Sequence, residues 1–278
     1  MCAGALASRS RPEATDMQRS IIVTTSRRPS ADLRRQAEQW AERLRAPAVP
    51  REGGLEQLCG QHGADGVLVV SQQRVTYHEP ETGLAYFFHP SMAKVRIHNL
   101  EAGRGDPMVE AMRLQPGDTL LDCTVGRATD AVVAAHAVGP EGSVLGIEKV
   151  PVIAQLTIHG LATYEDSSRK FTGLLRRVEV LEADYNDYLP TCADHSFDVV
   201  YFDPVFHEPA KRSEAMKPLR ELADKSTVSA EALQEALRVC RRCVVIKQRY
   251  GTPLWDALGI ESIVAGGSSR VEYGVAEP

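Results

Sequence analysis

The stretch "VVYFDPVFHEP", from Val199 to Pro209, places a carboxylate and an aromatic ring directly after residues typical of a buried strand. A carboxylate oxygen and the backbone carbonyl beside it can accept both N–H bonds of an exocyclic amine, which points the amine's lone pair at an electrophile. Proline stiffens the turn without offering an N–H, and an aromatic ring stacks on a base. Asp203, Pro204 and Phe206 therefore form a candidate catalytic set for a reaction at a base amine. The same residues also fit a structural turn with a core phenylalanine.

Further acidic residues stand at the ends of three earlier apolar runs. Asp122, Glu148 and Asp184 each close a strand-like segment, and Gly126 and Asp130 lie in the loop and helix that follow the first. A carboxylate after the second strand can accept from a ribose diol, and one after the third from an adenine amino group. The dinucleotide pattern G-x-G-x-x-G is absent, so these carboxylates favour S-adenosylmethionine, whose sulfonium and amino groups are cationic. Each carboxylate also has a structural alternative as a cap or an ion-pair partner.

Strands alternate with helices through the C-terminal part of the chain. We expect strands at residues 118–123, 143–148, 178–184, 196–203 and 242–247, and two more around a Gly-Ser turn near the end. This order implies parallel strands joined by right-handed crossovers, with an antiparallel hairpin at one edge. The predicted fold class is α/β, a Rossmann-like class I methyltransferase sheet with a smaller N-terminal α/β domain. Ligands bind such sheets beyond the carboxyl ends of the strands, where the acidic residues would meet.

The N-terminal part has a different order of elements. A β-branched run and a helix capped by Ser30 precede a short helix, a strand and a hairpin around "PETG". "SMAKVRIHNLEAGRGD" then reads as a bridge. We expect three parts: a disordered tail at 1–17, an accessory domain with its bridge at 18–104, and the methyltransferase domain at 105–278. Translation starts at either Met1 or Met17, since Met17 stands just before the first strand.

Composition is that of an ordinary globular protein, with 43% hydrophobic and 25% charged residues and a net charge of −5. No apolar run approaches the roughly 18 residues that span a bilayer, so we expect no membrane association. Six scattered cysteines favour a reduced, cytoplasmic setting. The "CRRC" pair from Cys240 to Cys243 lacks a second pair, which favours structural roles over redox or zinc chemistry. We expect no metal.

Several segments, in order, resemble the RsmJ family of small-subunit ribosomal RNA guanine-N2 methyltransferases over most of residues 90–275. The family's "VVYLDPMFP" is similar to "VVYFDPVFH", "DATAGLGRD" to "DCTVGRATD", "ERNPVVA" to "EKVPVIA", "GGGRGE" to "EAGRGD", and "RVVVKRP" to "RCVVIKQ". The resemblance implies RNA as partner and S-adenosylmethionine as cofactor. It implies cofactor contacts at Thr129, Asp130, Glu148, Lys149, Asp184, Tyr185 and Asp203.

The chain departs from that family at three places. Thr129 stands where the family has arginine, Asp184 and Tyr185 replace two serines, and His207 replaces a proline. These departures bear on the target more than on the cofactor. For the substrate we expect contacts from the residues near the catalytic motif and from the last parallel strand, namely His207, Lys211, Arg212 and Lys247. A solvated helix or an incidental histidine is the alternative.

"IIVTTSRRPS" and the helix after it resemble the opening of the Brix domain of ribosome-assembly proteins, over roughly residues 20–70. This resemblance implies an RNA-recruiting module in which Arg27 and Arg28 contact phosphates. Residues 1–104 carry 14 Lys+Arg against 11 Asp+Glu, a small excess that suits an anionic partner. The alternative is a scaffold domain that shields the sheet edge.

The sequence therefore predicts a cytoplasmic S-adenosylmethionine-dependent methyltransferase that acts on an exocyclic base amine in RNA, with guanine N2 of small-subunit ribosomal RNA first. Another amine acceptor, such as adenine, a tRNA base or a protein amide, remains open. So does a non-catalytic RNA-binding assembly factor that has kept the fold, and a dehydrogenase is least favoured. The sequence leaves the oligomeric state open.

Overall fold

The computed structural model describes residues 19–90, 92–205, 221–224, 226–266 and 270–278. The chain packs into two compact units. The smaller unit comprises the chain up to Gln72 together with His78–Gly83. The larger unit comprises Gln73–Tyr77 together with the chain from Leu84 onward. Among the described residues, no helix is long and apolar enough to cross a bilayer.

The first unit is built on a pair of parallel strands and two helices. Strand β1 (Ile21–Thr25) pairs with β2 (Gly66–Val70), with α1 (Ala31–Leu44) and α2 (Leu55–His62) between them in the chain. Helix α1 begins where the Ser30 hydroxyl accepts from the Leu33 backbone N–H, which confirms the predicted cap. The small sheet has the strand order β1-β2-β3-β4, in which β3 (Val75–Glu79) has residues of both units and β4 (Leu84–Tyr86) belongs to the second.

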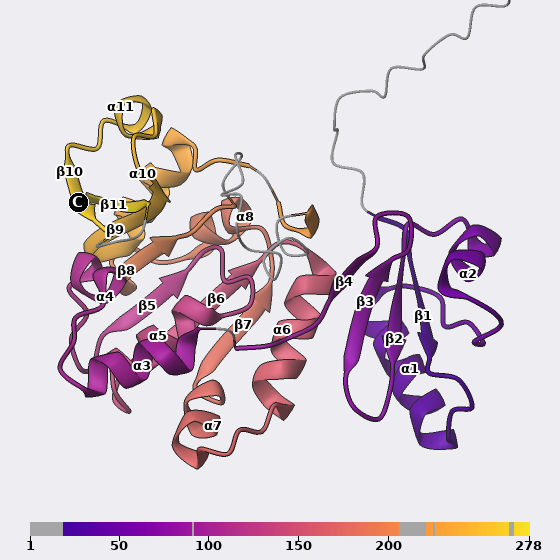
Figure 1. The fold of residues 1–278 in the computed structure, drawn as a ribbon. Helices are drawn as coiled ribbons and strands as arrows, with labels where there is room; N and C mark the ends of the chain where they lie inside the picture. Colours follow the sequence, from indigo (N-terminus) through magenta and orange to yellow (C-terminus); the bar gives the residue numbers. More distant parts are fainter. Residues whose placement is uncertain (1–18, 91, 206–220, 225, 267–269) are drawn as a thin grey trace, which may run out of the picture. The chain divides into compact units, whose positions relative to one another are not determined.

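The second unit contains a seven-stranded sheet of order β10-β11-β9-β8-β5-β6-β7 (Figure 1). Neighbouring strands from β7 across to β9 pair in parallel, whereas β11 runs antiparallel to both β9 and β10. This arrangement confirms the predicted α/β sheet with its antiparallel C-terminal hairpin. The strands are β5 (Thr119–Asp122), β6 (Ser143–Glu148), β7 (Val178–Glu182), β8 (Phe197–Phe202), β9 (Cys240–Arg249), β10 (Ser262–Ala265) and β11 (Val271–Ala276).

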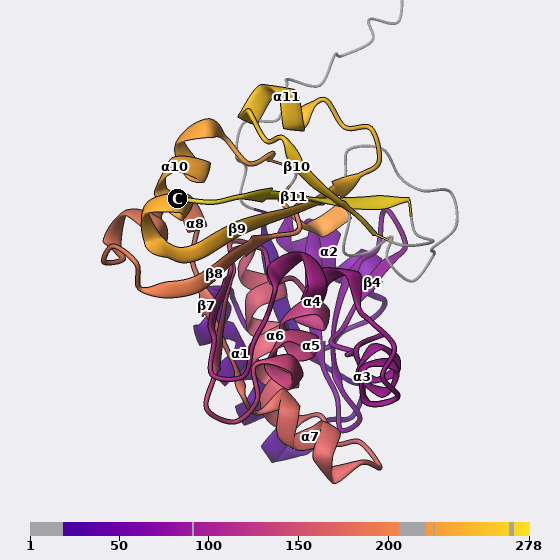
Figure 2. The same cartoon turned by 90° about the vertical axis from the view of Figure 1, so that its left-hand side faces the viewer.

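Helices cover both faces of this sheet because successive strand residues point to opposite sides. On β8, Val199 and Tyr201 pack with one set of helices, and Val200 and Phe202 with the other. The first set is α3 (Ala93–Glu101), α4 (Pro107–Met112), α5 (Thr129–Ala137) and α7 (Arg169–Leu175). The second set is α8 (Tyr185–Tyr188), α10 (Ala230–Val239) and α11 (Leu254–Leu258). Figures 1 and 2 show α3, α4 and α5 together on one face, and α6 (Pro151–Thr163) packs along β6 and β7.

The segment that we expected to be a bridge between the domains, residues 91–106, contains a helix. It contains helix α3, whose Ala93 and Ile97 are buried in the same core as α5. The residues between Ala93 and Glu101 include no glycine or proline, and the two buried side chains are four apart on one helical face. Helix α3 is therefore part of the core of the larger unit.

The two cysteines of "CRRC" lie in separate parts of the core. Cys240 packs with the α10 side of the sheet, and Cys243 with the α4 side, where its sulfur lies 3.7 Å from the Met112 carbonyl oxygen. Their opposite placement follows from the alternation of side chains along β9. Each cysteine contributes to packing, as the sequence predicted for this pair.

Candidate active site

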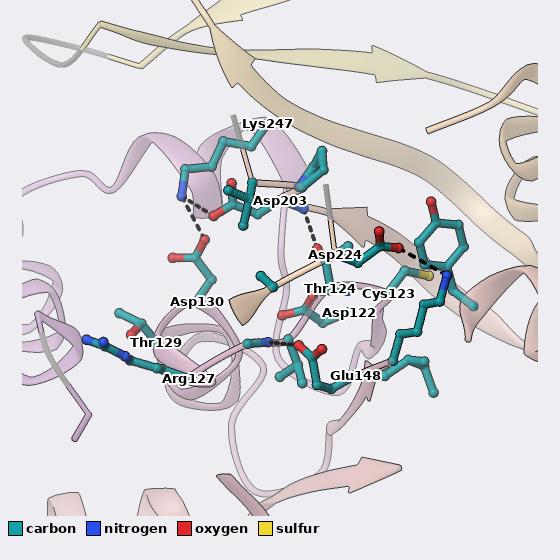
Figure 3. Close-up of a pocket in the computed structure, with 18 of the residues that line it drawn as sticks. Asp122, Cys123, Thr124, Arg127, Thr129, Asp130, Glu148, Asp203, Asp224 and Lys247 are labelled. Carbon is teal, nitrogen blue, oxygen red and sulfur yellow. Dashed lines mark hydrogen bonds and ion pairs between the residues drawn. The ribbon is translucent and has the colours of Figure 1, made fainter. Parts of the chain in front are cut away.

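The carboxyl ends of β5, β6 and β8 open into a cavity of about 280 Å³, close to the size of small-molecule pockets, which start at about 300 Å³ (Figure 3). It also receives a side chain from β9. The cavity brings together many of the residues that the sequence singled out: Asp122, Gly126, Thr129, Asp130, Glu148, Lys149, Tyr185, Asp203, Pro204 and Lys247.

Glu148, at the tip of β6, holds the loop that follows β5. Its carboxylate accepts from the backbone N–H of Gly126 at 3.1 Å and of Val150 at 2.8 Å. Gly126 has a φ of 51°, in the left-handed region that glycine adopts without strain. Burial raises the pKa of Glu148 to about 7, although its backbone hydrogen bonds oppose the shift. A buried acceptor of this kind suits a ribose diol.

Asp122, at the tip of β5, is 2% exposed and accepts from the backbone N–H of Thr124 at 3.0 Å. Burial raises its pKa well above the usual range, and the charges of Asp130 and Asp203 add to the shift. Three carboxyl groups, at Asp122, Glu148 and Asp203, thus line one cavity with raised pKa values. Burial is the largest cause of each shift, and a cationic ligand beside these groups would favour their ionised forms.

Asp203 follows β8 directly and is fixed at two points. Its backbone N–H donates to the Thr124 hydroxyl at 2.6 Å, and its Oδ2 lies 2.6 Å from the Lys247 ammonium (Figure 3). Burial raises the pKa of Asp203 to about 6; the Lys247 charge lowers it and the Asp130 charge raises it. Pro204 also lines the cavity.

Asp130, in the first turn of α5, is held by protein groups on both carboxylate oxygens. Oδ2 accepts from the Tyr201 hydroxyl at 2.8 Å and from Lys247 at 3.0 Å, and Oδ1 pairs with Arg96. Arg96 also makes two bonds of 2.8 Å to Asp106. Burial alone would raise the pKa of Asp130, but Lys247 and Arg96 hold it well below its usual range.

Lys149 and Tyr185 also line the cavity. Lys149 lies 3.2 Å from Asp184 and 3.4 Å from Asp224. The Tyr185 ring meets Phe202 edge to face at 5.3 Å. Asp184 does not line the cavity; it caps α8 by accepting from the Asn186 backbone N–H at 2.9 Å.

The substrate residues expected from the sequence lie partly in the cavity, partly in the smaller unit and partly outside the described residues. Lys247, expected to contact the substrate, lines the cavity with its side chain 20% exposed. Arg27 and Arg28 are exposed after β1 in the smaller unit. Four expected residues lie outside the described residues: Phe206, His207, Lys211 and Arg212.

The sequence analysis missed three residues that organise the cavity: Arg96, Thr124 and Tyr201. Tyr201 carried a signal, because it lies two residues before Asp203 and so faces the same side of the sheet. Thr124 lies two residues after Asp122, in the loop where capping hydroxyls are common. Arg96 carried none, since its segment did not read as a helix.

Residues 56–271 match the family model described as a putative SAM-dependent methyltransferase. The chain belongs to this family. A relative from Bacillus subtilis (strain 168), named "Uncharacterized protein YpiP", is 35% identical over 256 residues, which cover 92% of this chain and 99% of the relative. The chain is therefore an S-adenosylmethionine-dependent methyltransferase, and the predicted cofactor is confirmed.

The resemblance to the RsmJ family is also confirmed, because the chain is similar to relatives named "Ribosomal RNA small subunit methyltransferase J". The one from Nitrosococcus oceani is 31% identical over 188 residues, 65% of this chain and 72% of the relative. The one from Coxiella burnetii (strain RSA 331 / Henzerling II) is 34% identical over 184 residues, 63% and 68%. The SAM-dependent methyltransferase NGO1261 from Neisseria gonorrhoeae, 16% identical, superposes with a TM-score of 0.62 over 92% of this chain and 96% of its own, which shows the fold.

Proposed function

We propose that this methyltransferase modifies an exocyclic amino group of a base in RNA, with guanine N2 of small-subunit ribosomal RNA as the first candidate. The observation that carries the proposal is the position of Asp203. Its carboxylate lines the cavity at the tip of β8, next to Pro204, and beside the buried carboxyl group of Asp122. An acceptor of this kind suits an amine whose N–H bonds must be oriented before it attacks.

The donor set of the cavity fits the cofactor. Bound S-adenosylmethionine supplies a methyl group on a sulfonium, which leaves as a neutral thioether. Glu148 would accept from the ribose diol, and Asp122 would face the cationic part, whose charge would favour the ionised form of this buried carboxyl group. Lys149 and Tyr185 would border the adenine.

Asp203 would act on the acceptor amine. Lys247 engages Oδ2, so Oδ1 is the oxygen that we expect to accept an amine N–H. This contact aims the nitrogen lone pair at the methyl carbon and excludes a water from that position. After transfer the nitrogen carries one proton too many, and the carboxylate, whose pKa is about 6, can receive it.

RNA as substrate is supported by the names of the ribosomal RNA methyltransferase relatives. Base pairing and stacking bury a base amine in duplex RNA, so we expect a loop or a flipped base. In the smaller unit, the exposed Arg27 and Arg28 would contact phosphates of the same RNA. A cytoplasmic location is supported by the five described cysteines, which are all unpaired.

Nucleoside mapping tests this proposal. Small-subunit ribosomal RNA from a deletion strain would be digested and compared by mass spectrometry with RNA from the parent strain. We expect the loss of one N2-methylguanosine, restored by the wild-type gene and not by Asp203→Ala. Unchanged ribosomal nucleosides, with a methyl group missing from tRNA or from a protein, would contradict it.

A further inference from the structure

We propose that Lys247 is a positioning residue that holds the Asp203 carboxylate in the orientation and the ionised state that amine acceptance requires. The inference rests on the proposed function of Asp203. It goes beyond that function by assigning a task to a cation that the sequence pattern associated with RNA. Figure 3 shows Lys247 directed at both Asp203 and Asp130 rather than away from the cavity.

The sheet register explains why Lys247 reaches Asp203. Strands β8 and β9 are parallel, with Phe202 opposite Ile246, so Asp203 and Lys247 occupy the next position on each strand. Side chains at neighbouring positions of paired strands point to the same face. Helix α5 covers the same face of the sheet. Its Asp130 is therefore close enough to form the second ion pair of Lys247.

Asp130, the second carboxylate that Lys247 contacts, is itself held by a series of hydrogen bonds and ion pairs. Asp130 is fixed by Tyr201 and Arg96, and Arg96 is fixed by both oxygens of Asp106. Asp106 in turn caps α4 by accepting from the backbone N–H of Met108 at 3.1 Å. The ammonium group of Lys247 is therefore held by residues that are themselves held, which limits the orientations open to Asp203.

The charges of this network leave one negative charge in excess. Arg96 and Lys247 are the cations, and Asp106, Asp130 and Asp203 are the carboxylates. Asp203 is the carboxylate beside the proposed acceptor. Lys247 itself stays protonated: burial lowers its pKa, but Asp130 and Asp203 outweigh burial and raise the pKa above its ordinary value. Lys247 is thus unsuited to accept the proton from the amine.

Within the described part of the chain, five titratable groups face Asp203 from the elements around it. Lys247 lowers its pKa, whereas Asp130 raises it, and Asp122 adds a further carboxyl group. Tyr201 and Tyr273 have raised pKa values, chiefly because they are buried, and remain neutral near pH 7. Removing Lys247 should therefore move the titration of Asp203 to higher pH, and neutralising Asp130 should move it to lower pH.

The test compares Lys247→Met with Asp130→Asn, Lys247→Arg and a matched control, Lys170→Met. Lys170 pairs with Glu101 on the surface, with its side chain 69% exposed. Methyl transfer from S-adenosylmethionine to small subunits from the deletion strain would be measured across pH 5–9. For Lys247→Met we expect a loss of about 100-fold at pH 7 and an acid limb raised by about one pH unit or more. Lys247→Arg should recover most of the rate, and Lys170→Met should match the wild type.

Asp130→Asn is the decisive partner, because a purely structural role would affect both variants alike. We expect its acid limb to move to lower pH, opposite to that of Lys247→Met. Shifts in the same direction, or lower rates with no shift in either variant, would overturn the inference. Circular dichroism would establish that each variant is folded.

A second measurement is independent of the acceptor. The carboxyl ¹³C signal of Asp203 in the full-length protein, assigned by its loss in Asp203→Asn, would be titrated in the wild type and in both variants. An upward shift for Lys247→Met and a downward shift for Asp130→Asn support the inference, and an unchanged midpoint in both overturns it. If the wild type transfers no methyl group to RNA, the proposed function fails, and this titration alone decides the role of Lys247.

Discussion

The backbone N–H of Asp203 donates to the Thr124 hydroxyl at 2.6 Å, which joins the turn after β8 to the loop after β5. These two positions are 79 residues apart in the chain. The bond fixes the backbone from which the Asp203 carboxylate projects. It therefore links the loop beside the cofactor cavity to the residue proposed to orient the acceptor.

Replacing Thr124 with valine removes that acceptor and keeps the side-chain shape. We expect a stability loss of about 1–2 kcal/mol and a methyl-transfer rate lowered about tenfold, with Thr124→Ser close to wild type. Thr24→Val is the matched control, since the Thr24 hydroxyl donates to the Val49 carbonyl oxygen in the smaller unit. It should lose similar stability and keep its rate. Equal rate losses in the two valine variants would count against the link to Asp203.

Glu148 should make cofactor binding depend on pH. Burial raises its pKa from 4.5 to about 7, so the free enzyme binds this proton more tightly than the unfolded chain does. Its contribution to stability is therefore present at low pH and is lost as the pH rises through about 7. A ribose diol binds the ionised form, so affinity for S-adenosylhomocysteine should rise up to about tenfold per pH unit below 7. Calorimetry should show this slope for the wild type and a shallower one for Glu148→Gln, in which Asp122 and Asp203 still titrate.

Arg96 should be one of the most costly positions to change. Arg96→Met leaves the buried Asp106 carboxylate without its cation and leaves Asp130 with Lys247 alone, and we expect a loss of about 3–5 kcal/mol. Arg35→Met breaks an exposed pair with Asp32 and should cost less than about 1 kcal/mol. Urea unfolding monitored by circular dichroism measures both. A similar loss of unfolding free energy in the two variants would show that the buried network contributes little to stability.

Gly160 allows a close approach between α6 and the segment after β4. A Cβ at this position would overlap the ring of Phe88, so Gly160→Ala should destabilise the protein by about 1–3 kcal/mol. Gly173, on α7, has open space around its Cβ position, and Gly173→Ala should stabilise by about 0.5–1 kcal/mol. Thermal unfolding should therefore shift in opposite directions, and equal shifts would contradict the packing argument.

The strand tips could be found from the sequence because each acidic residue ends its strand or directly follows it. Asp122, Glu148 and Asp203 needed only two facts: where an apolar run ends, and that parallel strands end at one edge. The order of strands and helices then fixed the sheet class. These signals are local, and local patterns survive in a single sequence.

The partners of those residues could not be found in the same way. Lys247 reaches Asp130, which lies 117 residues earlier, and Arg96 reaches Asp130 across 34 residues. Such contacts depend on how α3, α5 and β9 pack against one another. That packing cannot be read from the spacing of residues along the chain. From the sequence, Lys247 is therefore only a candidate substrate contact, and the structure adds its partly buried ion pairs with Asp130 and Asp203.

The central claim is that the Asp203 carboxylate orients the acceptor amine and is not needed to hold the cofactor. The most direct measurement compares Asp203→Ala with the wild type, using calorimetry for S-adenosylmethionine and tritiated methyl transfer to small subunits from the deletion strain. We predict cofactor affinity within about threefold of wild type and a transfer rate lower by about 10²–10⁴. Transfer by Asp203→Ala at the wild-type rate would contradict the account.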